Sequence, residues 1–170
     1  NRKNKVLIVV PTRELAIQIQ DELKGFTNGM KIFSVCCVGG AYIGKQLSEL
    51  RYSNEFIIGT PGRLKDLIER KAIFLNQFGT VVLDEADRML DMGFINDMRF
   101  LMAGMPKPRH TLFFSATLSP EIERLIGEFL HEPVRISVKT RDTAKNVEQD
   151  IVRVVRGLNK IDVLRELLAR

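Results

Sequence analysis

Short apolar runs alternate with amphipathic helical patterns along most of this sequence. The runs occupy residues 5–10, 31–38, 55–58, 80–83, 111–114 and 134–138. Between them, residues 13–26 and 121–130 place their apolar side chains on one face at helical spacing. Buried strands separated by helices predict right-handed crossovers and a parallel α/β sheet with helices on both faces. Ligands of such sheets gather at the carboxyl ends of the strands.

Composition predicts a water-soluble protein with one main core. The 170 residues suffice for one α/β domain, and no apolar run approaches the ~20 residues that a membrane span needs. The net charge of +5 is compatible with a polyanionic partner, although the basic residues form no tract. Cys36 and Cys37 are neighbours in an expected strand, so their side chains should point to opposite faces and not bridge. Free thiols suit a reducing compartment, and we expect an intracellular protein, cytoplasmic or, in a eukaryote, nuclear.

A polar stretch at residues 139–146 divides the sequence. We expect residues 1–138 to form one domain and residues 139–146 to be a linker. Beyond it, residues 147–155 alternate like a strand and residues 160–170 have a helical pattern, which together cannot make a core. The sequence opens without an initiator methionine and stops in a helix without a cap, so we expect a piece of a longer protein.

Three carboxylates follow the apolar run that ends at residue 83, where residues 80–87 read Thr-Val-Val-Leu-Asp-Glu-Ala-Asp. At the end of a buried strand, Asp84 can reach a hydrated Mg²⁺ on a nucleotide. Glu85 can orient or deprotonate the water that attacks the terminal phosphate. The alternative is that these acids only cap the next helix and suit its dipole.

Three further motifs also follow strands: Pro-Thr-Arg-Glu-Leu-Ala at 11–16, Thr-Pro-Gly-Arg at 60–63 and Ser-Ala-Thr at 115–117. Thr12 and Thr60 are suitable helix caps, and Pro61 suits the first helical position. Arg13 and Arg63 then fall in the first turn of a helix, where backbone N–H groups and the dipole favour a phosphate. For each arginine alone, the alternative is a surface ion pair.

In order and spacing, these four motifs resemble those of the DEAD-box ATP-dependent RNA helicases, from about residue 5 to the end of the chain. The resemblance implies a RecA-like fold, with residues 1–138 as an amino-terminally truncated first domain. Residues 147–170 would be the first strand and helix of a second. ATP and Mg²⁺ are the implied cofactors. The implied partner is RNA, bound through its sugar-phosphate backbone without sequence choice, and the implied activity couples ATP hydrolysis to single-strand binding and local duplex unwinding.

The resemblance also implies individual roles. Asp84 and Glu85 are the metal-linked and catalytic acids, with Mg²⁺ held through water. Asp87 bonds to Ser115 and Thr117, a link through which a shift at the nucleotide moves the strand leading to the RNA surface. The implied RNA-binding residues are Pro11, Thr12, Arg13, Gly40, Thr60, Pro61, Gly62, Arg63, Gly93 and Phe94. Ordinary turn roles for Ser115 and Thr117, and a core position for Phe94, are the alternatives.

Residues 39–46 imitate another phosphate-binding motif. They read Gly-Gly-Ala-Tyr-Ile-Gly-Lys-Gln and fit Gly-x-x-x-x-Gly-Lys, but Gln46 stands where a Ser or Thr hydroxyl should ligate Mg²⁺. The resembled family carries here a Gly-Gly pair and, six residues after the second glycine, a glutamine. We therefore expect no phosphate loop at this place. Because the family's own phosphate loop precedes the motif at 11–16, we expect the chain to lack it and to be inactive alone.

Two other functions stay open. The chain as it stands can act as a non-catalytic RNA-binding or partner-docking module that uses only the arginine surface. A DNA-directed helicase relative is the second alternative, because the 2′-hydroxyl is what distinguishes the two nucleic acids. His110 and His131 have no acidic or cysteine-rich neighbourhood, so we expect no zinc site.

Overall fold

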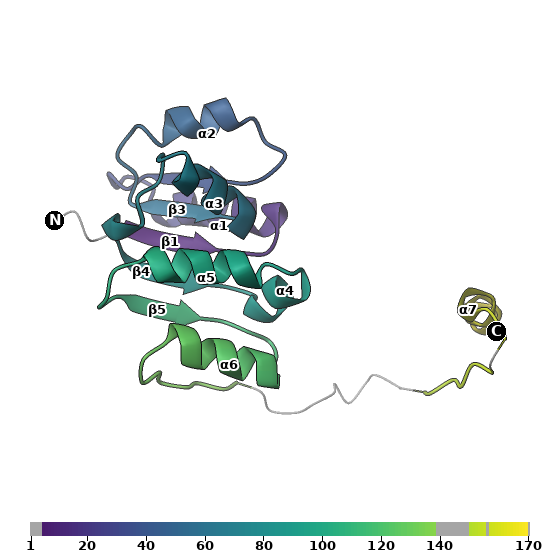
Figure 1. The fold of residues 1–170 in the computed structure, drawn as a ribbon. Helices are drawn as coiled ribbons and strands as arrows, with labels where there is room; N and C mark the ends of the chain where they lie inside the picture. Colours follow the sequence, from purple (N-terminus) through teal and green to yellow (C-terminus); the bar gives the residue numbers. More distant parts are fainter. Residues whose placement is uncertain (1–4, 139–149, 156, 170) are drawn as a thin grey trace. The chain divides into compact units, whose positions relative to one another are not determined.

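The computed structural model describes residues 5–138, 150–155 and 157–169, and the chain divides into two units, residues 1–133 and 134–170. The first unit contains a five-stranded parallel sheet in the order β2-β3-β1-β4-β5 (Figure 1). Its strands are β1 (Lys5–Val9), β2 (Ser34–Cys37), β3 (Phe56–Gly59), β4 (Phe78–Leu83) and β5 (His110–Phe113). The sheet confirms the predicted fold class and five of the six expected strands.

Helices cover both faces of this sheet (Figure 1). They are α1 (Arg13–Phe26), α2 (Ile43–Glu49), α3 (Pro61–Glu69), α4 (Ala86–Asp91), α5 (Ile95–Gly104) and α6 (Pro120–Phe129), with a 3-10 helix η1 (Leu75–Gln77). On one face α1 packs through Ala16 and its apolar stripe, because that stripe recurs at helical spacing. The other face carries α3, α5 and α6, whose buried side chains belong to one larger cluster.

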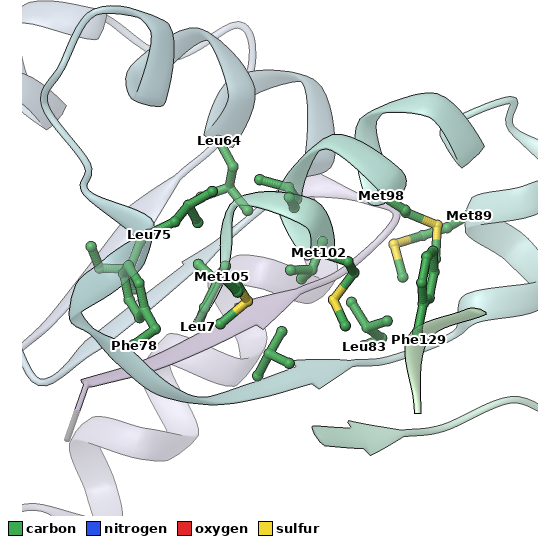
Figure 2. Close-up of a cluster of buried hydrophobic side chains, with 14 of the residues drawn as sticks. Leu7, Leu64, Leu75, Phe78, Leu83, Met89, Met98, Met102, Met105 and Phe129 are labelled. Carbon is green, nitrogen blue, oxygen red and sulfur yellow. The ribbon is translucent and has the colours of Figure 1, made fainter. Parts of the chain in front are cut away.

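The larger cluster is the main core of the first unit. Figure 2 shows Leu7 and Leu83 from the central strands together with four methionines of the helices and loops, Met89, Met98, Met102 and Met105. Phe78, at the start of β4, is 1% exposed within it. Unbranched methionine side chains fill irregular spaces between a twisted sheet and its helices. Packing in this core holds the strands in place, and with them the carboxyl ends at which the motifs begin.

The strand expected at residues 134–138 does not form, and that prediction was wrong. Val134 and Ile136 are 89% and 86% exposed, and none of the described strands pairs with this segment. An alternating pattern becomes a strand only where a neighbouring backbone accepts and donates its hydrogen bonds. Residues 150–155 form no strand either, whereas residues 139–149, with the expected linker, lie outside the described residues.

The second unit contains one described helix, α7 (Lys160–Leu168), which confirms the helix expected there. Asn159 caps it, with its Oδ1 accepting a hydrogen bond from the Ile161 N–H at 3.0 Å. Within the described ranges of the chain, no helix combines the length and apolarity needed to cross a membrane.

The adjacent cysteines point to opposite faces of β2, as predicted. Cys37 is buried in the larger cluster, and Cys36 packs against the cluster under α1. Both are free thiols. Burial raises the pKa of Cys36 to about 11 and that of Cys37 to about 12, so little thiolate exists at neutral pH.

Candidate nucleotide and nucleic-acid site

The four motifs begin side by side at the carboxyl edge of the sheet. Backbone hydrogen bonds continue past the strand ends and join neighbouring motifs: Val10 N to Gly59 O at 3.0 Å, Asp84 N to Val9 O at 3.0 Å and Phe114 N to Leu83 O at 2.8 Å. Thr60 N donates to Cys37 O at 3.1 Å and so joins its motif to β2. This is the edge at which parallel α/β sheets bind ligands.

Asp84 and Glu85 occupy the turn between β4 and α4. Glu85 has a left-handed backbone, with φ 48° and ψ 50°, a conformation that costs a non-glycine residue roughly 1 to 3 kcal/mol. Asp84 Oδ1 accepts the Glu85 N–H at 2.9 Å, which orients the first carboxylate. Glu85 Oε2 lies 3.1 Å from Arg88 Nη1. Arg88 was not among the residues expected here, although its three-residue spacing from Glu85 is a signal for such a helical pair.

The two acids fit a Mg²⁺ that is held mainly by phosphate oxygens and water. Among residues 5–138, 150–155 and 157–169, no three His, Cys, Asp or Glu side chains gather into a metal cage. Magnesium keeps several waters and typically takes only one or two carboxylates beside substrate phosphates. Asp84 and Glu85 match that demand, and a complete protein cage is not required.

Asp87 connects α4 to the segment after β5. Its Oδ2 accepts hydrogen bonds from the Thr117 N–H at 2.9 Å and the Thr117 hydroxyl at 3.0 Å. The Ser115 hydroxyl donates to the Thr117 carbonyl at 2.8 Å. Burial would raise the pKa of Asp87, but hydrogen bonds from Thr117 and the Arg88 N–H, with a smaller contribution from Ser115, outweigh it and lower the pKa below the ordinary value. The expected Asp87–Thr117 contact is thus present, whereas the Ser115 hydroxyl donates to the Thr117 carbonyl instead of bonding directly to Asp87 as expected.

The Asp87 link should depend on pH. A carboxyl whose pKa is lower in the folded state stabilises that state above its unfolded pKa, here 3.8, and loses the contribution as pH falls through the folded pKa. Replacing Asp87 with Asn is therefore expected to destabilise the protein at neutral pH and to have a shrinking effect below pH 3.8. Denaturant midpoints of both proteins across this range measure the difference. Asp91→Asn, an exposed change in the same helix, is the control, and a pH-independent effect of Asp87→Asn would contradict the link.

Arg13 and Gly40 approach each other at the start of α1. Arg13 is exposed, and its Nη1 donates to the Gly39 carbonyl at 3.4 Å. Gly40 has a φ of +76°, and a Cβ placed on it would overlap Arg13 Nη1. The Thr12 hydroxyl accepts the Leu15 N–H at 3.3 Å and so caps α1 as predicted. These contacts place a cation beside an exposed backbone turn.

Thr60 and Arg63 begin α3 differently from what the sequence suggests. Thr60 holds the N-cap position without a side-chain cap hydrogen bond, so the predicted cap chemistry is wrong there. Its backbone is held by β2 and its side chain is buried, at 8% exposure. Pro61 takes the first helical position, as predicted. The Arg63 side chain is only 14% exposed and donates to Ala41 O at 3.3 Å and to Gln46 Oε1 at 3.1 Å.

Residues 39–46 do not have the arrangement of a phosphate loop. The Lys45 side chain is 78% exposed, and its ammonium lies 3.9 Å from Glu49 Oε1. Gln46, at the position of the hydroxyl that would bind Mg²⁺, is 3% exposed and donates to the Val38 carbonyl at 3.1 Å. The lysine therefore faces solvent and the amide faces the protein, which supports the expectation that this stretch holds no triphosphate.

Gly93 and Phe94 separate α4 from α5. Gly93 has a φ of +81°, which provides the expected break between the helices. Phe94 is half-buried and packs against the larger cluster, so its ring contributes to the core. Gly62 is exposed at the start of α3, and the nearest atom to a Cβ built on it is Asp97 Oδ2 at 3.8 Å. Pro11 is buried. Arg13, Gly40, Gly62 and Gly93 are thus the exposed members of the expected RNA-binding set.

A groove of about 750 Å³ runs along β2, between α1 and α2. Its lining includes Ala41 and Gln46 but not Asp84, Glu85 or Asp87. β2 is an edge strand, and side-chain amides cap one of its carbonyls and the carbonyl just after it: Gln20 Nε2 donates to Ser34 O at 3.1 Å, and Gln46 Nε2 donates to Val38 O. Such capping limits the edge's ability to pair with another strand.

The family model described as DEAD/DEAH box helicase matches residues 1–125. The chain is 41% identical over 165 residues to the RNA helicase CrhR of Synechocystis sp. (strain ATCC 27184 / PCC 6803 / Kazusa), covering 96% of this chain and 34% of that protein. It is 40% identical over 165 residues to the DEAD-box ATP-dependent RNA helicase CshA of Bacillus subtilis (strain 168), covering 96% of this chain and 33% of that protein. The chain thus spans about a third of the length of these relatives.

Solved structures are similar as well. The crystal structure of a DEAD box protein from the hyperthermophile Methanococcus jannaschii matches with a TM-score of 0.73 and 36% identity, over 78% of this chain and 36% of that chain. A hypothetical ATP-dependent RNA helicase from Sulfolobus tokodaii matches with a TM-score of 0.72 and 34% identity, over 75% of this chain and 38% of that chain. These likenesses confirm the RecA-like α/β fold.

Proposed function

Because the chain belongs to the DEAD/DEAH box helicase family, we propose that it is part of an ATP-dependent RNA helicase. The proposed activity couples ATP hydrolysis to single-strand RNA binding and local duplex unwinding. The observation that carries this proposal is the meeting of four motifs at one sheet edge, with Asp87 bonded to Thr117 across two of them. The relatives' names, which specify RNA, support the choice of nucleic acid.

In this proposal Glu85 orients the water that attacks the terminal phosphate, and it accepts a proton from that water. Its left-handed backbone directs the carboxylate from the end of β4 before α4 begins. Asp84 would hold, through a water, the Mg²⁺ that accompanies ATP. The metal, when bound, neutralises charge on the phosphates. Residues 39–46 are not proposed to hold the triphosphate, because Lys45 and Gln46 are turned away from such a role.

Asp87 is the proposed connection between hydrolysis and RNA. Asp87 lies two residues after Glu85 in the sequence and accepts both hydrogen bonds from Thr117. A movement of α4 at the nucleotide therefore pulls on the segment that follows β5. Because two hydrogen bonds join α4 to the segment after β5, the two segments are expected to move together.

The proposed RNA surface contains Arg13, Gly40 and residues 60–63, with residues 93–94 beside it. Exposed Arg13 and Gly62 lie in the first turns of α1 and α3, where backbone N–H groups favour phosphate. Contacts with the backbone give affinity without sequence choice. Because the proposed substrate is cellular RNA, we propose an intracellular location, cytoplasmic or, in a eukaryote, nuclear.

RNA binding by the chain is the direct test. Replacing Arg13 with Ala is expected to weaken the binding of a labelled polyuridine strand. The loss of affinity should be the same for single strands of other sequences. The substitution should also flatten the plot of log affinity against log salt by about 0.7, the share of one phosphate on a single strand. Fluorescence anisotropy across a salt series measures both quantities.

Lys24→Ala is the matched control, because Lys24 lies in the last turn of the same helix with a 59% exposed side chain paired to Asp21. It should leave the slope nearly unchanged. Equal slopes for Arg13→Ala and Lys24→Ala would remove Arg13 from the RNA surface. Competition with the matching deoxyribose strand separates an RNA preference from a DNA-directed relative.

A further inference from the structure

Gln46 is a buried amide beside the proposed RNA surface. It is 3% exposed, although it lies in a seven-residue helix whose neighbouring residue, Lys45, faces solvent. Both ends of the amide have partners in the protein: Nε2 donates to Val38 O at 3.1 Å, and Oε1 accepts from Arg63 Nη1 at 3.1 Å. One side chain thus joins the end of β2 to the first turn of α3.

Arg63 extends the same connection to the loop at residues 39–41. Its Nη1 also donates to Ala41 O at 3.3 Å, while Arg13 Nη1 donates to Gly39 O at 3.4 Å. The loop at residues 39–41 therefore accepts hydrogen bonds from two arginines that lie in the first turns of two different helices. Gly40, in the middle, keeps its exposed left-handed backbone.

The partner of Arg63 is a neutral amide, which does not cancel the positive charge of the guanidinium. The nearest carboxylate recorded for Arg63 is Asp66, with Nε and Oδ2 3.9 Å apart. A glutamate in place of Gln46 would give the guanidinium a charged partner and cancel much of its field. The amide fixes the guanidinium in place and leaves its positive charge available to a nearby phosphate.

We infer that Gln46 is a positioning residue: it holds Arg63 and the loop at residues 39–41 in the arrangement that receives the RNA backbone. This rests on the proposed function. A loop ordered before binding does not lose its conformational freedom on binding, so preorganisation adds affinity without any contact between Gln46 and RNA. Gln46 contributes no charge of its own and should affect affinity but not its salt dependence.

Gln46→Met tests this, because it keeps the side-chain volume and removes the amide. The expected result is a loss of about three- to tenfold in affinity for labelled polyuridine, with an unchanged salt slope. Gln46→Glu should flatten the slope by about 0.7, as Arg63→Ala does, because it neutralises Arg63. In the double variant Gln46→Met/Arg63→Ala, the loss should equal that of Arg63→Ala alone, since both changes remove the same connection.

Gln20→Met is the matched control. Gln20 also donates its amide to a β2 carbonyl, that of Ser34 at 3.1 Å, and none of its hydrogen bonds described here involves an arginine. It should bind RNA like the unchanged chain, and all variants are compared below their unfolding midpoints. If Gln46→Met and Gln20→Met bind alike while Arg13→Ala weakens binding, the inference about Gln46 is overturned. If Arg13→Ala also has no effect, the proposed RNA surface itself fails.

Discussion

Replacing Glu85 with Gln is expected to lower RNA-stimulated ATP hydrolysis by about 10²- to 10⁴-fold, the usual contribution of a positioned general base. The amide keeps the size of the side chain and can hold a water, but it cannot take the proton. RNA binding should persist, because Glu85 lies between β4 and α4 and the arginine surface belongs to α1 and α3. Phosphate release and RNA anisotropy, measured on a version extended to the length of its curated relatives, give the two readouts.

Two variants make this result specific. Glu22→Gln makes the same chemical change at an exposed site on α1 and should leave hydrolysis unchanged. Lys45→Ala should retain turnover, because the Lys45 ammonium faces solvent near Glu49. Loss of turnover in Lys45→Ala would restore residues 39–46 as a phosphate loop. Full activity of Glu85→Gln would remove Glu85 from the proposed mechanism.

Replacing Phe78 with Ala is expected to destabilise the protein by about 3 to 5 kcal/mol, through lost apolar burial and the cavity left behind. Phe78 is 1% exposed and contributes to the cluster shown in Figure 2. It also begins β4, the strand that ends at the acids, so the loss should reach the site. Denaturant unfolding with a fixed m-value measures the change.

Phe26→Ala is the control for Phe78→Ala. Phe26 ends α1 and is 77% exposed, so the same chemical change should alter stability by less than about 0.5 kcal/mol. Similar midpoints for the two variants would show that the cluster around Phe78 is not the main core. A midpoint shift with a changed m-value would indicate altered compactness of the unfolded or native state, or unfolding that is no longer two-state.

The sequence predicted the fold well where local pattern and tertiary packing agree. Residues 13–26 form α1 with the predicted bounds, because their apolar stripe, the Thr12 cap and the sheet beneath all favour a helix. The pattern at residues 134–138 is equally regular, but none of the described strands pairs with it. Periodicity records which face of a segment is apolar and contains no information about its hydrogen-bond partner.

The site was predictable to a lesser extent. Asp84, Asp87 and Thr117 follow strand ends, so a parallel sheet necessarily brings their motifs to one edge. The burial of Gln46 was not predictable, because a seven-residue helix is too short to show a period. The hydrogen bond between Arg63 and Gln46 was not predictable either, because the two residues are 17 positions apart in the sequence. Long-range polar contacts depend on the strand order, which the sequence pattern does not specify.

A glycine shared with relatives at position 40 is weak evidence that a protein still binds nucleic acid. A Cβ there would displace the flexible end of the Arg13 side chain, and the left-handed backbone, with a φ of +76°, already disfavours a side chain. Selection for a stable loop alone would retain the glycine, even in a descendant that had ceased to bind nucleic acid. A glycine at this position is therefore a record of ancestry and architecture. Exposed positions such as Arg13, whose side chain is not part of the core, are the better markers of a surface still in use.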